Sequence, residues 1–530
     1  MKRFDWRALA RSTSGNVLPI TAVSIIVLAG LIGGAVDIAR AYMVKNQLQN
    51  ACDAGVLAGR RAVTTNGFDS GAKRQADLYF NANFRMDGNT VSNTRFQTSS
   101  DETGNEVAGS ASTRMSTAVM NLFGKNSIDL NAACMASMSV GNSDVMMVLD
   151  VTGSMGAPIS KMRALQAAMK NFYDTVAAAK AGSNARVRFG FVPYSSSVNV
   201  GRLIYDLNPD YLVDSYTVNS RVAEYVERSF FGFKWKEFVG WTYQPVSDFD
   251  YATYKSFRPV TTLTGGTDRP ANVTSTWAGC IEERETVPAA SFSYSRLGKM
   301  TPGGAQDLDL DSAPDLSDDR TKWAPMWPEV AYSRAKLPQD TSGSKAGGPC
   351  PAPARLLSEM NKAQFDAVAD SLVPTGSTYH DIGLIWGGRL ISPDGIFSAN
   401  VNERAANGGA VSRHIIFMTD GNMEPSTTTQ SSYGIEALDR RVTGNGSSSQ
   451  QVARHNSRYL AICEAIKAKG THIWAVAFGL DLTKEVHRTA LANLTTCADS
   501  GSVFKADDAQ QLNEAFQDIA KEVGELRIRR

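Results

Sequence analysis

The sequence has almost no net charge and lacks the motifs of several common functional classes. Its 530 residues carry a formal net charge of +1. No long lysine or arginine run is present, which argues against a nucleic-acid-binding surface. The patterns G-x-S-x-G, H-E-x-x-H and the P-loop are missing, and neither His380 nor His414 has a nucleophile–base pattern beside it. We therefore expect a protein that is not an enzyme.

Cysteine patterns typical of zinc sites are also missing. There is no C-x-x-C and no Cys/His cluster at zinc-ligand spacing, which argues against structural zinc. An even number of cysteines in an exported chain suits disulfides, and we favour the pairs Cys463–Cys497 and Cys280–Cys350 as locally plausible. The alternative is that some are small buried residues. The six cysteines are Cys52, Cys134, Cys280, Cys350, Cys463 and Cys497.

One long uncharged segment lies near the N-terminus, at residues 17–36. As a helix, about 20 residues at 1.5 Å each cross roughly 30 Å of hydrocarbon. Four basic residues and one acidic residue precede it, so residues 1–16 are expected in the cytoplasm and the remaining chain outside. A cleaved signal peptide is the alternative, but the apolar run is longer than usual and no convincing A-x-A site follows.

A helical pattern continues beyond this segment, from Asp37 through Leu57, which predicts one long helix leaving the membrane. The stretch from Gly33 to Ala62, with Asp37 just beyond the span and LQNACDAGVLAG after it, resembles the N-terminal segment of TadE/TadG-type proteins of the tight-adherence (Flp) pilus system. Short alternating stretches from Tyr79 to about Val140 predict β-hairpins. Residues 37–140 are thus expected to form a helical extension and a small α+β stalk.

The stretch SDVMMVLDVTGSMG, residues 143–156, combines an apolar strand, a polar loop and the start of a helix. Loops at the carboxyl ends of strands in open α/β sheets are where ligands bind. Asp150, Thr152 and Ser154 alternate in this loop, so their oxygens can converge on one point. A carboxylate with hydroxyls suits Mg²⁺, Mn²⁺ or Ca²⁺ and is poor for zinc.

This motif resembles the first motif of the metal-ion-dependent adhesion site of the von Willebrand factor A (VWA) family, with Thr152 in place of a serine. The family's two further motifs follow in order, as Thr378 before a predicted amphipathic helix and Asp420 after the apolar strand RHIIFMTDG. Thr375 is a rival to Thr378, which fits the Gly-x-Thr spacing better. The resemblance implies a divalent metal, Mg²⁺ or alternatively Mn²⁺ or Ca²⁺, with one coordination position open to a carboxylate of a partner protein.

Further strands and helices alternate along the chain. Residues 186–193, 472–479 and 503–506 are predicted strands; helices are predicted near Leu356, over 452–468 and around Leu512. This alternation predicts an α/β fold with a doubly wound, mostly parallel sheet, Rossmann-like as in VWA domains. Residues 143–200 and 354–530 are expected to form this domain, and residues 201–353 a large irregular insertion.

The insertion is rich in aromatic residues, which favour either an irregular core or an exposed interface for protein or sugar; core packing is the better interpretation. Its acidic residues lie at EF-hand-like spacing but lack the required glycine, which favours a solvated loop over a Ca²⁺ site. The aromatic residues are Phe230, Phe231, Phe233, Trp235, Trp241, Tyr243, Trp277, Trp323 and Trp327, and the acidic ones are Asp307, Asp309, Asp311, Asp315 and Asp318.

Two functions fit these patterns. The first is a pilus-assembly or adhesion protein, anchored in a bacterial inner membrane by a single helix, with most of the chain in the periplasm or at the cell surface. The second is a VWA scaffold of another envelope complex for secretion or a surface polymer. The resemblance of the N-terminal segment favours the first.

Overall fold

The computed structural model describes residues 17–63, 68–86, 90–100, 106–137, 142–180, 183–266, 269–295, 298–327, 329 and 350–524. The chain divides into two compact units, Met1–Val140 with Leu526–Arg530, and Gly141–Glu525. Among the described residues, the first unit contains one cluster of buried apolar side chains and the second unit contains two.

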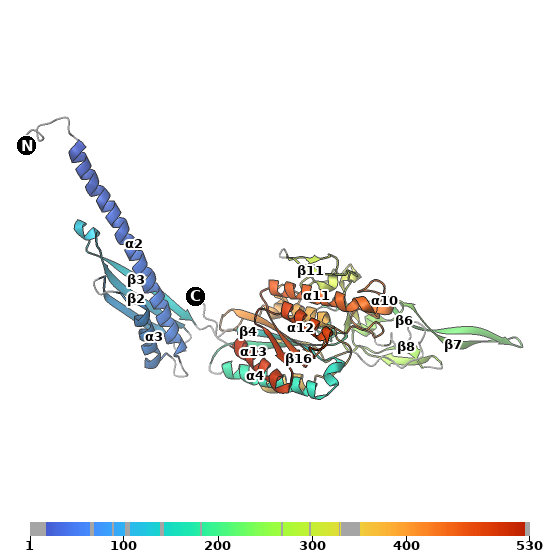
Figure 1. The fold of residues 1–530 in the computed structure, drawn as a ribbon. Helices are drawn as coiled ribbons and strands as arrows, with labels where there is room; N and C mark the ends of the chain where they lie inside the picture. Colours follow the sequence, from blue (N-terminus) through green and yellow to red (C-terminus); the bar gives the residue numbers. More distant parts are fainter. Residues whose placement is uncertain are drawn as a thin grey trace, which may run out of the picture. The chain divides into compact units, whose positions relative to one another are not determined.

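The first unit consists of long helix α2 packed on a three-stranded antiparallel sheet of order β1-β2-β3 (Figure 1). The elements are α2 (Val17–Arg61), α3 (Ser70–Asn83), β1 (Val91–Ser100), β2 (Glu106–Ser116), the short 3-10 helix η1 (Met120–Phe123) and β3 (Ser127–Ser137). The disulfide Cys52–Cys134 joins α2 to β3. The predicted hairpins are present from Val91 onward over the described residues, but Tyr79, where the prediction begins, lies in helix α3 instead. The predicted stretch beyond Ser137 lies outside the described residues.

Helix α2 continues without a break from the predicted span into the predicted extension. Among the described residues it is the single helix long and apolar enough to cross a membrane, with a mean hydropathy of 2.2 over its most apolar stretch. In its N-terminal part Val23, Ile25, Leu28 and Ile32 are exposed. In its C-terminal part Val44, Leu48, Ala51 and Val56 are instead buried, because this half of the helix packs against the sheet of its own unit.

Asp37 lies where α2 meets the connection between β2 and β3. Its buried carboxylate accepts hydrogen bonds from the backbone N–H groups of Ala118, Val119 and Met120, at 2.8, 2.9 and 2.7 Å. Ala118 and Val119 precede η1, and Met120 is its first residue. N–H groups at the start of a helix lack backbone partners, and the Asp37 carboxylate satisfies these three. Asp37 therefore fixes this connection against α2.

The second unit is built on a six-stranded sheet of order β14-β5-β4-β15-β16-β17. The strands are β4 (Asn142–Asp150), β5 (Val187–Tyr194), β14 (Arg355–Ser358), β15 (Val411–Thr419), β16 (His472–Phe478) and β17 (Val503–Ala506). The five strands from β5 to β17 are parallel, and the edge strand β14 is antiparallel to β5. The fold is mixed α/β, as expected.

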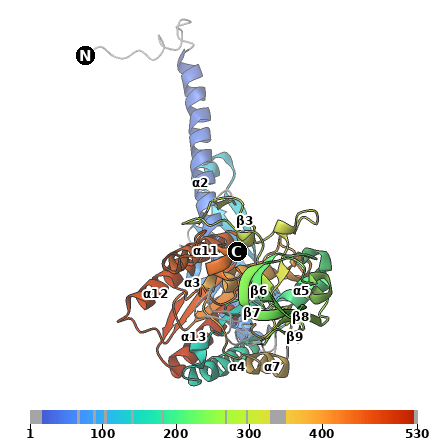
Figure 2. The same cartoon turned by 90° about the vertical axis from the view of Figure 1, so that its right-hand side faces the viewer.

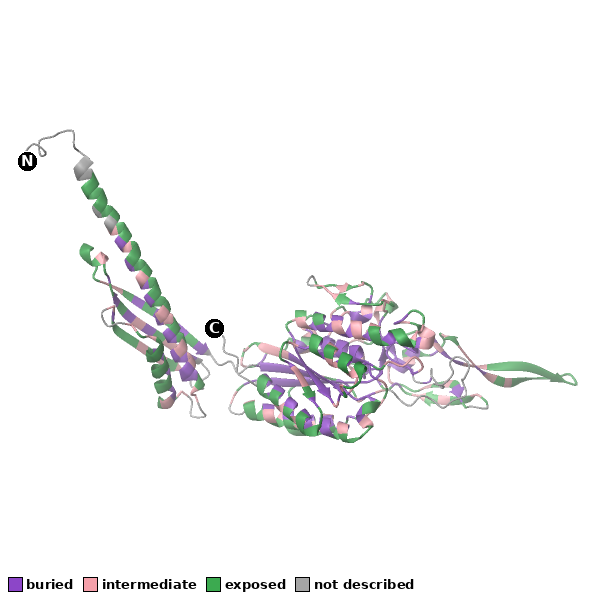
Figure 3. Cartoon of the chain, viewed as in Figure 1, coloured by how far each residue is buried: buried purple, intermediate pink, exposed green. Residues whose placement is uncertain are grey.

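Helices cover both faces of this sheet (Figure 2). One face packs against α8 (His380–Ile391), α11 (Ser448–Ala468) and α12 (Glu485–Cys497), and the other against α4 (Ser160–Lys180), α7 (Lys362–Asp370) and α13 (Ala509–Gly524). Strand β4 alternates between the faces, with Met146 and Val148 on the first and Val145, Met147 and Leu149 on the second. A strand covered on both sides reads as an unbroken apolar run, which explains the sequence pattern here (Figure 3).

Two predicted helices differ from the structure. No helix lies at Leu356, because Arg355–Ser358 is the edge strand β14 and the helix starts later, where Asn361 caps α7. The helix after Thr378 is not amphipathic, since all twelve residues of α8 are buried. Its outer side packs against the insertion, where Trp323 lies 5.4 Å from Trp386 between ring centres.

The insertion consists of one long hairpin, β6–β7, together with short strands, short helices and irregular chain packed beside α8 and α11. Its elements are α5 (Gly201–Leu207), η3 (Pro209–Tyr211), β6 (Val218–Phe230), β7 (Phe233–Val246), α6 (Tyr251–Lys255), β8 (Val260–Gly265), β9 (Ala271–Ser275), β10 (Ile281–Glu282), β11 (Ser293–Tyr294), β12 (Met300–Thr301), η4 (Gln306–Leu308), η5 (Asp319–Thr321) and β13 (Ala324–Pro325). The remaining short elements of the unit are η2 (Gly153–Gly156), α9 (Ser398–Val401) and α10 (Glu436–Asp439).

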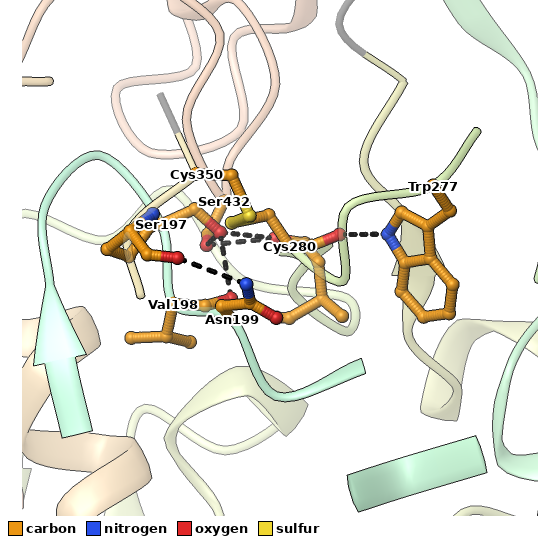
Figure 4. The surroundings of a disulfide bond; sticks show 9 residues. Ser197, Val198, Asn199, Trp277, Cys280, Cys350 and Ser432 are labelled. Atoms are coloured by element: carbon orange, nitrogen blue, oxygen red, sulfur yellow. Dashed lines mark hydrogen bonds between the residues drawn. A yellow bond between two sulfur atoms is a disulfide. The ribbon is translucent and has the colours of Figure 1, made fainter. Parts of the chain in front are cut away.

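The disulfides Cys280–Cys350 and Cys463–Cys497 are both present, which confirms the favoured pairs. Around Cys280, Trp277 Nε1 donates to the backbone oxygen of Cys280 at 2.6 Å, and Ser432 Oγ donates to Ser197 Oγ at 2.9 Å (Figure 4). Asn199 Nδ2 also donates to Pro351 O at 3.0 Å. The bond from Asn199 ties the chain that follows β5 to the insertion, and the bond between Ser432 and Ser197 ties it to the loop after β15.

The aromatic residues of the insertion divide into two groups. Trp241, Trp277, Trp323 and Trp327 are buried, as the core interpretation predicts, and Tyr243 is half-buried. Phe230, Phe231, Phe233 and Trp235 are exposed, and for these four the core interpretation is wrong. The reason is that they lie at the end of a two-stranded hairpin, β6–β7, where no other element of the described residues covers them.

The acidic run of the insertion is only partly a solvated loop. Asp307 is buried, with its carboxylate bonded to Arg458 and to the Tyr433 hydroxyl. Asp311 pairs with Lys469. In the described chain, no group of three or more His, Cys, Asp or Glu side chains is placed to hold a metal ion.

Candidate functional site

The loop after β4 makes a tight turn in the residues that directly follow Asp150. The Asp150 carboxylate accepts from the backbone N–H of Thr152 at 2.9 Å, an aspartate turn of the kind that begins many tight loops. The Thr152 and Ser154 hydroxyl oxygens lie 2.9 Å apart. The alternating residues of the motif thus bring one carboxylate and two hydroxyls together.

Asp420 reaches the same place from the neighbouring strand. Strands β4 and β15 are parallel with Leu149 opposite Met418, so the residues that follow both strands meet at one edge of the sheet. Ser154 Oγ donates to Asp420 Oδ1 at 2.7 Å, and Thr419 Oγ1 donates to Asp150 Oδ2 at 2.7 Å. Asp150, Thr152, Ser154 and Asp420 therefore form one hydrogen-bonded cluster.

The third predicted segment approaches this cluster through its backbone. Thr375 N donates to Val151 O at 2.7 Å, and Gly153 N donates to Gly376 O at 3.0 Å. Gly376 has φ 72°, and a Cβ there would lie 2.9 Å from Ser196 Oγ, so a glycine is needed for this close approach. The buried Thr378 follows, and its carbonyl accepts from Glu424 N at 3.0 Å. Thr378 and its rival Thr375 thus lie in a loop that adjoins the cluster.

The two carboxylates lie out of water with little positive charge nearby. Burial, and after it the negative charge of Asp420, raises the pKa of Asp150 to about 7. Lys161, in the first turn of α4, is the cation that contacts the cluster, with Nζ 2.8 Å from Asp420 Oδ2. One ammonium facing two buried carboxylates leaves negative charge for a further cation to compensate. The hydroxyl and carboxylate oxygens fit Mg²⁺, Mn²⁺ or Ca²⁺.

Three residues of this region were not identified from the sequence as parts of the site. Lys161 gave no signal, because a lysine in a helix is usually a solvated residue. Thr419 read as the end of a buried strand. His380 lies behind the cluster with Nε2 3.0 Å from Thr419 Oγ1, and burial lowers its pKa to about 4, so it is neutral at pH 7.

Asp381 lies in the first turn of α8, where an acidic side chain suits the helix N-terminus. Its carboxylate is buried, with Oδ2 2.7 Å from His455 Nδ1, and so faces α11 rather than the metal motif. His414, the other histidine near the motifs, is also buried and contacts Trp474 in the neighbouring strand.

Comparison with known proteins finds a family similar to the N-terminal segment. Residues 15–64 match the family of Flp pilus-assembly TadE/G-like proteins. The match covers the apolar part of α2 and its extension, and the second unit lies outside it. No curated protein matched the sequence.

Solved structures with some similarity include three pilus proteins. The pilus adhesin SpaC from Lactobacillus rhamnosus GG is 13% identical over 81% of this chain, with a TM-score of 0.32. This chain covers 34% of SpaC, about a third of its length. The PilB minor pilin from Streptococcus sanguinis is 9% identical, covering 82% of this chain and 78% of its own, with a TM-score of 0.32. The vWF domain of the type V pili tip protein Mfa5 from Porphyromonas gingivalis is 12% identical, covering 72% and 95%, with a TM-score of 0.30. These scores are too low to establish a common fold.

Proposed function

We propose that this chain is a membrane-anchored pilus-assembly or adhesion protein whose exported VWA domain captures a carboxylate of a partner protein through a divalent metal. The observation that carries the proposal is the cluster of Asp150, Thr152, Ser154 and Asp420 at the loop edge of a parallel sheet, with the Thr378 loop beside it. The family match of residues 15–64 supports the pilus context. The apolar α2 supports a single-pass anchor in a bacterial inner membrane, with the second unit in the periplasm or at the surface.

In this proposal Ser154, Thr152 and Thr378 offer hydroxyl oxygens to the metal, and the two aspartates supply negative charge. A bound Mg²⁺, Mn²⁺ or Ca²⁺ would supply a coordination position for an acidic side chain of the partner. The protein's own part is to hold the oxygens together before the metal arrives. The Asp150 turn, the bond from Ser154 to Asp420 and the contact of Gly153 with Gly376 serve this purpose. No bond is made or broken, so we assign no catalytic residue.

The proposal is tested first by metal binding to the full chain in detergent. We expect saturating Mg²⁺ or Mn²⁺ to raise the melting temperature by several degrees. The variant Asp150→Ala should lose this rise, and Asp206→Ala, which removes an exposed aspartate elsewhere in the unit, should keep it. A wild-type melting curve that is unchanged by saturating metal would count against the site.

The second test concerns the partner. The full chain is immobilised and exposed to detergent extracts of cell envelopes, with Mg²⁺ or with a chelator. A partner bound through a metal-bridged carboxylate should be retained with Mg²⁺, released by the chelator, and not retained by Asp150→Ala. Retention that ignores both the chelator and the substitution would contradict the proposed mechanism even if metal binds.

A further inference from the structure

The hairpin β6–β7 projects from the second unit (Figures 1 and 3). Four exposed aromatic side chains lie at its end. The exposed fractions are 67% for Phe230, 88% for Phe231, 79% for Phe233 and 49% for Trp235. Isolated exposed apolar residues need no explanation, but a contiguous group at the end of a projecting element marks a contact surface. From this feature we infer that the hairpin tip docks on the surface of an anionic lipid bilayer.

The base of the hairpin is firmly anchored. The buried Arg221 guanidinium stacks on Trp241 at 4.0 Å and donates to the carbonyl of Gly266 at 2.7 Å. Asn219 donates to Asp439 at 2.8 Å. Beyond this base, Glu224–Phe230 of β6 is exposed throughout. Seven residues of strand extend roughly 23 Å, so the tip is held well away from its own unit.

The turn at the tip keeps a bulky residue in an unfavourable conformation. Phe231 and Gly232 link the paired residues Phe230 and Phe233, and have φ 47° and 83°. A two-residue turn with both φ positive usually contains Asn-Gly, and glycine suits the second position here. A phenylalanine with positive φ is disfavoured by its Cβ. Local strain of this kind is typical of functional positions, and Phe231 is also the most exposed of the four aromatic residues.

The aromatic residues are concentrated on one face of the ribbon. Residues paired across two strands share a face, so Phe230, Phe233 and Trp235 lie together, with Arg228 beside Trp235. The opposite face carries Ser229 with Lys234, and Glu227 with Lys236. The outer hairpin is therefore apolar on one side and polar on the other, as in elements that lie at a membrane interface.

The charge of the tip complements an anionic surface. Between Glu227 and Glu237 the sequence is RSFFGFKWK, with three basic residues and no acidic one. Arg228 is neutralised in part by Glu237 at 2.6 Å, and Lys236 lies opposite Glu227. Lys234, which lies opposite the neutral Ser229, is therefore the base best placed to interact with phosphate groups. Aromatic rings at the headgroup boundary with lysines just above them are a recurrent arrangement at membrane surfaces. This combination favours lipid over a purely apolar protein groove.

The backbone limits how far the tip can enter. The hairpin is a two-stranded sheet, so both outer edges have unpaired backbone groups, which cannot enter hydrocarbon. Only the turn, whose chain closes on itself, can pass the headgroups. The distance along β7 from Phe233 to Trp235 is about 7 Å, similar to the depth of interfacial elements. Addition of a partner strand to these edges is the less favoured alternative, because charged side chains line them and discourage pairing.

The experiment uses the full chain with α2 already inserted in nanodiscs of phosphatidylcholine, so that this helix does not bind added vesicles. The discs are immobilised in the presence of a chelator, which keeps the metal site out of the measurement. Separate vesicles of phosphatidylcholine, with or without phosphatidylglycerol, are then passed over them. We expect capture of vesicles, stronger by about tenfold when the anionic lipid is present.

Two sets of substitutions separate the apolar and the charged contributions. Phe230→Ser with Phe231→Ser and Phe233→Ser should abolish capture of both vesicle types. Lys234→Gln with Lys236→Gln should remove most of the roughly tenfold preference for anionic lipid. The matched control is Leu207→Ser with Leu316→Ser and Val486→Ser, which removes three exposed apolar side chains of the same unit and should leave capture intact. Unchanged melting temperatures of the variants show that the fold is retained.

Several outcomes would overturn the inference. Wild-type discs that capture no vesicles would do so, as would equal capture by the Phe→Ser variant. In a further outcome, the wild type captures no vesicles yet retains a protein from envelope extracts that the Phe→Ser variant does not retain. The tip would then be a protein-docking surface instead. If discs pair with one another through the tip, its partner is a second copy of the chain.

Discussion

Lys161 and Asp420 form an ion pair inside the proposed metal site, with Lys161 Nζ 2.8 Å from Asp420 Oδ2. The other carboxylate oxygen accepts from Ser154 Oγ at 2.7 Å. Both oxygens of Asp420 are thus occupied by partners from the same chain. The ammonium supplies a positive charge beside the oxygens to which a metal would bind, so the lysine and the metal compete for the same negative charge.

Removal of this ammonium should strengthen metal binding. We expect Lys161→Gln to lower the melting temperature in chelator, because buried Asp420 loses its counter-ion, and to tighten Mn²⁺ binding by roughly tenfold. Thermal shifts over a range of Mn²⁺ concentrations measure both effects. The control is Lys170→Gln on the same helix, whose partner Asp370 is exposed. Unchanged or weaker binding in Lys161→Gln would show that the lysine does not oppose the metal.

The two buried carboxylates should destabilise the metal-free protein. Asp150→Asn keeps the shape of the side chain and removes its repulsion with Asp420, so in chelator at pH 8 the free energy of unfolding should rise, on the order of 1 kcal/mol. The same variant should not respond to Mg²⁺. Chemical denaturation in chelator and in Mg²⁺ tests both points.

Asp144 provides a contrasting case on the same strand. It is also buried, but Arg188 donates to both of its oxygens, at 2.8 and 2.6 Å. Asp144→Asn should therefore lower the free energy of unfolding by about 3 kcal/mol. If Asp150→Asn were as harmful as Asp144→Asn, the Asp150 carboxylate would be compensated without a metal.

Stability should depend on pH through Glu282 in the insertion. Burial, opposed in part by Arg441, raises the pKa of Glu282 to about 7 from an ordinary value of 4.5. The folded state therefore binds more protons than the unfolded state between these two values. The contribution of Glu282 to the free energy of unfolding is fully present below about pH 4.5 and is lost as the pH rises to about 7, a change on the order of 2–3 kcal/mol.

Comparison of the wild type with Glu282→Gln isolates this effect. Loss of the charge near Arg441 shifts the free energy of unfolding by a constant amount. Denaturation at pH 5 and at pH 8 gives the difference in this free energy between the two proteins, and the change of that difference with pH reports Glu282 alone. Relative to the wild type, the variant should gain stability as the pH rises. Glu359→Gln, at an exposed residue, should show no such trend. A pH-independent difference for Glu282→Gln would refute the prediction.

Asp37 should control the connection that packs against α2. Asp37→Ala leaves the N–H groups of Ala118, Val119 and Met120 without their acceptor, so their hydrogen exchange should accelerate by at least about tenfold, as expected for loss of charge-assisted bonds. Asp53→Ala, at an exposed position of the same helix, should leave these amides unchanged. Exchange by mass spectrometry in nanodiscs is the measurement. Equal protection in both variants would mean that other contacts hold the connection.

The sequence alone was sufficient where a local pattern has one physical explanation. An unbroken apolar run at Val145–Leu149 is typical of a strand covered on both faces, and the structure buries β4 on both. An uncharged stretch of some 20 residues predicted the apolar part of α2. The resemblance to the motifs of VWA adhesion sites predicted that Asp150, Ser154 and Asp420 would meet, and parallel strands, which place their carboxyl ends at one edge, make this possible. Metal binding at these residues stays a prediction.

Tertiary contacts decided the features that no local pattern specifies. Leu356 forms an edge strand because Phe191 and Phe189 of β5 offer a free side for pairing, and α8 is buried all round because the insertion covers its outer side. The ion pair between Lys161 and Asp420 joins two residues that are 259 positions apart in the sequence. The aromatic residues of the insertion look alike in sequence, yet Trp323 is buried and Phe231 is exposed. Local periodicity determines which elements form, whereas exposure and ion pairing depend on which distant segments pack together.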